Sequence, residues 1–204
     1  MIVESIASME TADKSLIDAH LQGDKTAFSE IVRRYGDSVL GYLVRMSGNR
    51  EQAEDLFQET FKRVHEKAHT FRGDQFRSWL FTIATRVAID GLRRRRRLRV
   101  ISLNQRFDCA DKNSEELAAV AVADNSYEPS QEAIMAEQKK QVRQAVDLLP
   151  AMQRATLILA YYQQLSYREV AEVLGCSIGT VKTQMYRALR TLAQRLPEFG
   201  GEAK

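Results

Sequence analysis

Residues 165–196, LSYREVAEVLGCSIGTVKTQMYRALRTLAQRL, predict two short helices joined by a tight turn. Ser166 is followed three residues later by Glu169, which matches a capping box and predicts the start of the first helix. Gly175 is placed to end that helix, and Ser177 is an acceptable N-cap for the second. The stretch therefore has the layout of a helix-turn-helix.

The second of these helices is predicted to have one apolar and one polar face. Its apolar residues recur at three- and four-residue steps and form a packing stripe: Val181, Met185, Ala188, Leu189, Leu192 and Leu196. Its polar face and flanks carry side chains suited to a DNA major groove: Thr180, Lys182, Thr183, Gln184, Tyr186, Arg187, Arg190 and Gln194. We expect DNA binding; the alternative is an ordinary amphipathic hairpin with a solvated outer face.

The whole composition indicates an all-α, cytoplasmic protein. The chain has 204 residues, 44% of them hydrophobic, which leaves room for one or two domains. No signal peptide or bilayer-spanning run is apparent, and Cys109 and Cys176 lie far apart, so a reduced, cytosolic protein is expected. Nothing near Cys109 is predicted to stabilise a thiolate.

Charge is unevenly distributed, although the net charge is only +3. Residues 76–99 hold eight arginines and one acid, Asp90, whereas residues 101–130 hold two basic and six acidic residues. The basic block indicates polyanion binding, and the five consecutive arginines at 93–97 favour phosphate contacts. Residues 98–130 are interpreted as an acidic linker with a transient helix at 115–123; a passive tether is the alternative.

Apolar periodicity predicts helices at 13–22, 25–46, 51–68 and 76–97, and another that stops at Pro150. The inward stripe of the 76–97 helix is Phe76, Leu80, Ile83 and Val87. Trp79 and Phe81 lie beside or off this stripe, where stacking on unpaired bases and core packing remain open for Trp79. Residues 152–162 are expected to form the buried centre of the second domain. Tyr161 and Tyr162 could pack or reach DNA, and we expect them to pack.

Residues 65–69, HEKAH, match the zinc-binding pattern H-E-x-x-H. A catalytic zinc site would also need a third ligand, an open coordination position and a substrate cleft. The motif lies at the end of a helix before a polar loop, so we expect exposed histidines, no metal, no cofactor and no enzyme activity.

Several separate motifs resemble one protein family, the bacterial extracytoplasmic-function (group IV, sigma-70 superfamily) RNA polymerase sigma factors. Residues 53–61 (AEDLFQETF), 79–84 (WLFTIA), Ile89-Asp90 and the arginine run are similar to its second conserved region. Residues 149–154 (LPAMQR) and 165–189 are similar to its fourth region. The resemblance implies two small helical domains at 1–99 and 131–204, joined by a flexible acidic linker at 100–130.

The resemblance also implies a role for each stretch. The core-polymerase docking face, which binds the β′ clamp helices, corresponds to Asp55, Gln58 and Glu59. Capture and melting of the −10 element correspond to Trp79, Arg86, Asp90, Arg93 and Arg94. Contacts to the −35 element correspond to Thr180, Lys182, Thr183, Gln184, Tyr186 and Arg187.

The implied partners are core RNA polymerase (β′ clamp helices and β flap), promoter DNA and an anti-sigma factor, with no stable homo-oligomer. A polymerase-independent helix-turn-helix regulator is the alternative, but it would need a dimerisation surface, and no spare apolar stripe is evident. The chain departs from the family pattern at two places near DNA: Arg86 replaces the usual Asn, and Lys182-Thr183-Gln184 replaces Lys-Ser-Arg. These residues are candidates for altered promoter preference.

Overall fold

The computed structural model describes residues 2–73, 75–107 and 131–196, and every regular element in these ranges is helical. The first part of the chain forms α1 (Ile2–Leu21), α2 (Lys25–Ser47), α3 (Arg50–Lys67), the 3₁₀ turn η1 (Ala68–Thr70) and α4 (Phe76–Phe107). The second part forms α5 (Gln131–Asp147), α6 (Ala151–Leu157), the π-helical turn η2 (Ile158–Tyr162), α7 (Tyr167–Leu174) and α8 (Ile178–Arg195). No helix within the described ranges is long and apolar enough to cross a membrane.

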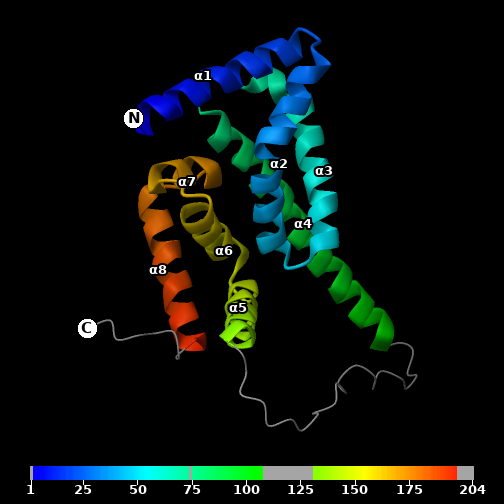
Figure 1. The fold of residues 1–204 in the computed structure, drawn as a ribbon. Coiled ribbons are helices and arrows are strands. Elements are labelled where there is room, and N and C mark those ends of the chain that lie inside the picture. The colour runs from blue at the N-terminus through cyan, green and yellow to red at the C-terminus, as the bar shows by residue number, and fades with distance from the viewer. Residues whose placement is uncertain (1, 74, 108–130, 197–204) are drawn as a thin grey trace.

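The first part is a bundle in which α2, α3 and α4 lie side by side and α1 crosses one end (Figure 1). Its core is built from the predicted apolar stripes; Ile31, Val39 and Leu80, for example, are fully buried. The turn between α2 and α3 is short because Gly48 adopts a left-handed conformation, φ 72°, and Asn49 caps α3 by accepting from the Gln52 N–H. The expected helices at 25–46 and 51–68 are confirmed to within one residue at each end.

Two helices are longer than expected. α1 begins at Ile2 rather than at residue 13, and α4 continues to Phe107, beyond the predicted domain boundary at 99 and into the predicted linker. The sequence from 92 to 107 contains neither Gly nor Pro, so no residue there stops the helix. The remaining predicted linker, including the transient helix at 115–123, lies outside the described residues.

The second part is a smaller bundle in which α6 and α8 pack together and α5 covers the lower end of α8 (Figure 1). Residues 155–159 are buried, as expected for its apolar centre. The prediction that Tyr161 and Tyr162 pack inward is wrong, because they are 67% and 43% exposed. The π-helical turn carries an extra residue and rotates both rings toward solvent, while the next residue, Gln163, is buried.

The two parts pack against each other. α7 lies on α4, and the turn of η2 lies against α2 (Figure 1). Val170, Ala171 and Val173 of α7 belong to the same buried cluster as the core of α2, α3 and α4. One large core therefore spans both parts, which the sequence does not predict, and a second, smaller cluster lies within the second part: Val146, Leu149, Leu157, Met185 and Ala188.

Candidate nucleic-acid interface

The turn between α7 and α8 is fixed by the capping residues that the sequence predicts. The Glu169 N–H donates to Ser166 Oγ at 3.3 Å, and the Ser166 N–H donates to Glu169 Oε2 at 2.7 Å, which completes the capping box. Gly175 ends α7 with φ +64°, and Ser177 caps α8 by accepting from the Thr180 N–H at 3.1 Å. The helix-turn-helix is thus confirmed by its termini.

The inner face of α8 follows the predicted stripe in part. Val181, Met185 and Ala188 are buried against α6 and α7. Leu189 is 52% exposed, so including it in the stripe is wrong, whereas Leu192 and the C-cap residue Leu196 are partly buried. Leu189 lies one position past Ala188, about 100° around the helix, where no neighbouring helix covers it.

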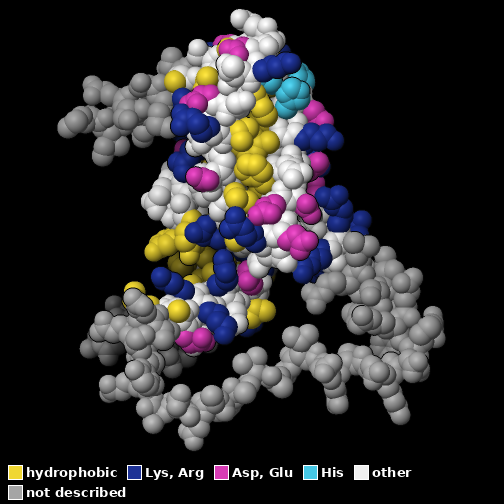
Figure 2. Space-filling model, turned by 45° about the vertical axis from the view of Figure 1, so that its right-hand side comes forward, with side chains coloured by type: hydrophobic (Ala, Val, Ile, Leu, Met, Phe, Trp, Pro, Cys, Tyr) yellow, Lys and Arg dark blue, Asp and Glu magenta, His cyan; other side chains and the backbone are white. Residues whose placement is uncertain are grey.

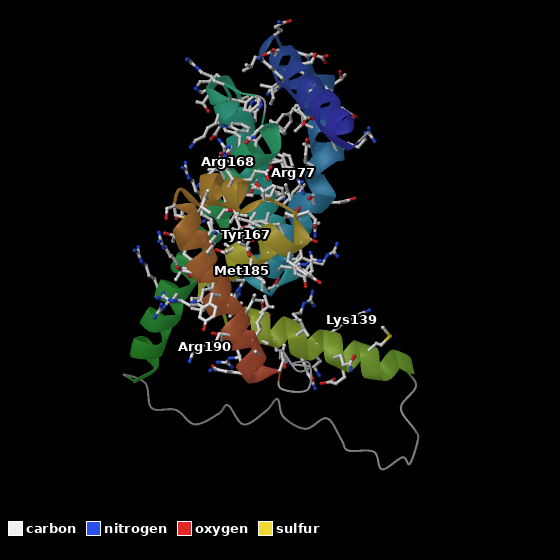
Figure 3. The ribbon with its side chains drawn as sticks, turned by 90° about the vertical axis from the view of Figure 1, so that its left-hand side faces the viewer. Arg77, Lys139, Tyr167, Arg168, Met185 and Arg190 are labelled. Carbon is white, nitrogen blue, oxygen red and sulfur yellow. The ribbon has the colours of Figure 1, made fainter. Side chains whose placement is uncertain are left out.

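The outer face of α8 presents most of the predicted −35 residues to solvent. Thr180, Lys182, Thr183, Tyr186 and Arg187 are exposed, and Gln184 is partly buried. The two threonine hydroxyls make local bonds, from Thr183 to the Gly179 carbonyl and between Thr180 and Ser177. Figure 3 shows Arg190 of α8 and Arg168 of α7 on the same outer side, which extends the positive charge of this face.

α4 carries the aromatic residues predicted for the −10 element. Trp79 is half-buried, with its ring 5.4 Å from Phe71 and 5.6 Å from Phe76, centroid to centroid. The indole is therefore packed in part and exposed to solvent in part. Phe81 is fully buried against Tyr42, so placing it off the inward stripe is wrong. The buried arc of α4 is wider than one stripe because α2 and α3 cover one side and α7 covers another.

The polar residues predicted for the −10 element all lie on the solvent side of α4. Arg86, Asp90, Arg93 and Arg94 are exposed, as are the remaining arginines of the run. The Arg93 guanidinium lies 4.0 Å from the Asp90 carboxylate, and both groups are more than half exposed, so this ion pair is weak. The arginines are thus available to a polyanion.

The predicted docking face lies on α3, beside the arginine run. Asp55 and Gln58 are exposed, and Glu59 accepts from Arg63 Nε at 2.8 Å. A hollow of about 480 Å³ at the α3–α4 junction is lined by both Asp55 and Arg94. Figure 2 shows acidic and basic side chains interspersed along this side of the molecule, beside an apolar stripe. The docking residues and the −10 residues are therefore neighbours.

The HEKAH motif does not form a zinc-binding helix face. α3 ends at Lys67, so His69 lies in the 3₁₀ turn and not one α-helical turn from His65. His65 Nδ1 instead lies 3.0 Å from His20 Nε2, and Figure 2 shows histidine side chains gathered at one end of the bundle. Among the described residues, no group of three or more His, Cys, Asp or Glu could hold a metal ion.

The lone described cysteine does not have the surroundings of a reactive thiol. Cys176 is partly buried in the turn between α7 and α8, and this burial raises the pKa of its thiol. A reactive cysteine needs the opposite shift. Cys109 lies outside the described residues.

Several buried polar residues were not predicted from the sequence, and three of them bear a charged or amide group. Asp13 accepts hydrogen bonds from Arg34 and from the Tyr35 hydroxyl, Arg154 donates to main-chain carbonyls, and Gln163 bonds to Ser38. Burial lowers the pKa of Arg154. Only the position of Arg154 in the LPAMQR stretch sets it apart in the sequence, and none of the three lies on a predicted DNA-contacting face.

An all-helical chain with an exposed helix-turn-helix face and a second arginine-rich helix defines a DNA-binding transcription protein. Two family models match it: Sigma-70 region 2 over residues 31–98 and Sigma-70, region 4 over residues 139–192. The chain is 32% identical to the ECF RNA polymerase sigma factor SigE of Mycolicibacterium smegmatis, covering 96% of this chain and 72% of that protein. It is 31% identical to the ECF RNA polymerase sigma factor SigW of Bacillus subtilis, covering 94% of this chain and 100% of that protein.

Solved structures share the fold at lower identity. CnrH in complex with the cytosolic domain of CnrY has a TM-score of 0.63 at 23% identity and covers 93% of this chain and 99% of that chain. RpoE in complex with the anti-sigma factor NepR from Bartonella quintana has a TM-score of 0.59 at 24% identity, covering 83% and 96%. The chain belongs to the family of ECF RNA polymerase sigma factors, and these matches do not favour a polymerase-independent regulator.

Proposed function

We propose that this sigma factor docks on core RNA polymerase through α3, reads a −35 duplex through α8 and captures a melted −10 strand through α4. The observation that carries the proposal is the order of the two matched regions, each of which presents its polar helix face to solvent. Residues 1–99 would form the docking and −10 unit, and residues 131–204 the −35 unit.

The docking step assigns Asp55, Gln58 and Glu59 to the β′ clamp helices. Two carboxylates one turn apart on a helix face complement a basic partner surface. The Arg63 side chain that pairs with Glu59 would have to yield to a polymerase cation, which is a small cost at a partly exposed site.

The −10 step assigns base stacking to Trp79 and phosphate contacts to Arg86, Arg93 and Arg94, with Asp90 beside them. A half-buried indole held by two phenylalanine rings is a rigid stacking surface, and stacking contributes about 1–3 kcal/mol per base. Each phosphate contact adds to the salt dependence of DNA affinity.

The −35 step assigns major-groove contacts to Thr180, Lys182, Thr183, Gln184, Tyr186 and Arg187. Arg187 can donate two hydrogen bonds to guanine, and Lys182 can neutralise a phosphate. Replacing Arg187 should therefore relax the preference for a particular DNA sequence, whereas replacing Lys182 should weaken binding to all duplexes alike.

The remaining assignments follow from the same family. We propose a cytoplasmic initiation factor without catalytic chemistry, cofactor or stable homo-oligomer. We further propose that residues 100–130 connect the two units inside the polymerase, that the β flap holds the second unit, and that an anti-sigma factor holds the protein inactive. The complexes of CnrH with CnrY and of RpoE with NepR support the last assignment.

Gel filtration with bacterial core RNA polymerase tests the docking step. The Asp55→Lys/Glu59→Lys variant should lose co-elution with the polymerase. The matched control is Asp18→Lys/Asp37→Lys, which makes the same change in net charge at exposed residues of α1 and α2. Loss in the first variant and retention in the control would support the proposed docking face.

Two results would overturn the proposal. Equal co-elution of both variants with the polymerase would show that the docking face is not on α3. No complex with the polymerase, together with binding of the free protein to a palindromic duplex as a dimer, would make the chain a conventional regulator.

A further inference from the structure

The contact between the two parts of the chain includes a polar pair at Gln163. This side chain is 5% exposed, and it lies at the end of the π-helical turn. Its Oε1 accepts from Ser38 Oγ at 2.7 Å, and its Nε2 donates to the Ser38 carbonyl at 3.2 Å. The Gln163 carbonyl accepts from Arg77 of α4. Gln163 is thereby bound to both α2 and α4.

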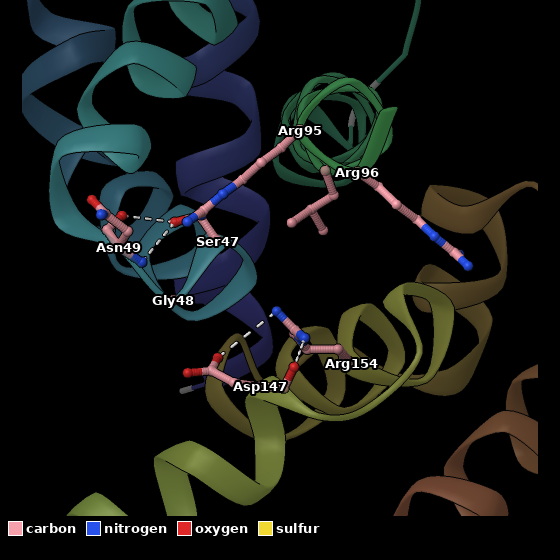
Figure 4. A pocket seen from close by; sticks show the side chains of 8 residues that line it. Ser47, Gly48, Asn49, Arg95, Arg96, Asp147 and Arg154 are labelled. Atoms are coloured by element: carbon pink, nitrogen blue, oxygen red, sulfur yellow. Dashed lines mark hydrogen bonds and ion pairs between the residues drawn. The ribbon is translucent and has the colours of Figure 1, made fainter. Parts of the chain in front are cut away.

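A second polar contact lies at the C-terminal end of α2, where Arg154 of α6 is 8% exposed. Its Nη1 donates across the interface to the Met46 carbonyl at 2.6 Å, and its Nη2 donates to the Asp147 carbonyl. The Asp147 carboxylate in turn lies against Gly48, at the end of α2 (Figure 4). A larger residue than glycine at position 48 would meet this carboxylate.

A third contact lies between these two. The Arg45 guanidinium of α2 stacks over the ring of Tyr162, 4.3 Å from its centroid. The three contacts follow α2 from Ser38 to Gly48, and each is made by residues 147–163. They leave the −35 face of α8 exposed, so they do not block it directly.

When the two parts are packed in this way, which we call the closed arrangement, α4 and α8 are nevertheless too close together to reach both promoter elements. Packed helices lie about 8–10 Å apart. Because α7 contacts both α4 and α8, α8 lies within about 20 Å of α4 where the three meet. Promoter elements two turns of B-DNA apart are separated by about 70 Å. One closed molecule cannot bridge that span with α4 and α8 together.

We propose that the Ser38–Gln163 and Arg154–Met46 contacts form an intramolecular latch, and that the latched protein is autoinhibited until the two parts separate. This proposal rests on the proposed function only for the requirement to reach both promoter elements. The latch itself is a property of the free chain, so it can be measured without polymerase. Each lost hydrogen bond shifts such an equilibrium by about fivefold to tenfold.

Pulsed electron paramagnetic resonance on the free protein tests the latch. Spin labels are placed at Lys62→Cys on α3 and Arg190→Cys on α8, both exposed, in a Cys109→Ser/Cys176→Ser background. With the latch residues unchanged, the two spin labels should show a single short distance. Ser38→Ala/Gln163→Ala should raise the long-distance population at least tenfold, whereas the matched control Ser29→Ala/Gln144→Ala, at positions that do not cross the interface, should not. A long, broad distribution before mutation, or no change in the double variant, would overturn the latch.

A reversible lock tests the autoinhibition. Ser38→Cys/Gln163→Cys, in the same background, is joined by a short, reducible bis-thiol crosslinker. The locked protein should co-elute with core polymerase but lose at least tenfold in promoter-dependent transcription, and reduction should restore it. Equal transcription before and after reduction would overturn the proposal. If the unlocked protein neither binds polymerase nor initiates transcription, the proposed function is wrong. The spin-label distances would then still show whether the latch exists.

Discussion

Replacing Asp13 by Asn is expected to destabilise the first part of the chain. Asp13 is buried, and its carboxylate accepts from Arg34 Nη1 at 2.7 Å and from the Tyr35 hydroxyl. The three side chains attach α1 to α2. An asparagine has the same shape, so the change tests charge and hydrogen bonding without opening a cavity.

The expected loss follows from the two hydrogen bonds. A bond to a charged group contributes about 1.5–3 kcal/mol, and the Asn oxygen can keep one of the two. Breaking a buried ion pair costs about 3–5 kcal/mol, but Arg34 is 26% exposed and lies 3.6 Å from Glu30, which lowers the cost. We therefore expect a decrease of about 2–3 kcal/mol in the free energy of unfolding.

Urea unfolding at 25 °C, followed by the fluorescence of Trp79, measures this change, because Trp79 lies in the first part of the chain. Asp18→Asn, on an exposed position of the same helix, is the matched control and should change stability by less than about 0.5 kcal/mol. In a Tyr35→Phe background the cost of Asp13→Asn should fall by about 1 kcal/mol. A cost below about 1 kcal/mol, or one equal to that of the control, would refute the role given to Asp13.

Three further predictions can be tested by thermal unfolding. Gly36→Ala should stabilise the protein by about 0.5–1 kcal/mol, because a Cβ there makes only an ordinary contact at 3.6 Å. Gly48→Ala should destabilise the protein, because φ at this position is +72°. Equal effects of the two substitutions would contradict this. Ser166→Ala should cost about 1 kcal/mol through loss of the capping box, and Ser166→Asp should recover most of it. Burial and the charge of His65 lower the pKa of His20, so the unfolded chain binds this proton more readily, and stability should fall as pH drops from above 6.5 to below it. His20→Gln should flatten that dependence, and an unchanged pH profile would count against the pair.

Local patterns were sufficient to predict α2, α3 and the termini of α7 and α8, but not the start of α1 or the end of α4. The termini of α7 and α8 are set by residues that bond to, or adopt special backbone angles within, their own turn: Ser166, Gly175 and Ser177. A short window of sequence is therefore enough to predict where these helices begin and end. The exposed polar face of α8 follows from periodicity in the same way. The roles of these residues toward polymerase and promoter stay predictions.

Long-range packing could not be predicted from such windows. Phe81 is buried because its ring packs against Tyr42 of α2, which is separated from α4 in sequence by the whole of α3. Asp13 and Gln163 are ordinary polar residues in sequence, and only their partners on α2 make them structural. The π-helical turn at residues 158–162 also carries no local signal, since ILAYY is compatible with an ordinary α-helix.

That π-helical turn makes the chain tolerant of a change in length at a single point. One π turn holds about one residue more than an α turn, so deleting one residue between 158 and 162 would let the segment relax to a regular α-helix. The helical segments on either side would keep nearly the same relative orientation, because the wider turn is what accommodates the extra residue. A frame-preserving loss of three nucleotides there should therefore disturb the contact of Gln163 with Ser38 less than the same loss in the regular helix α2.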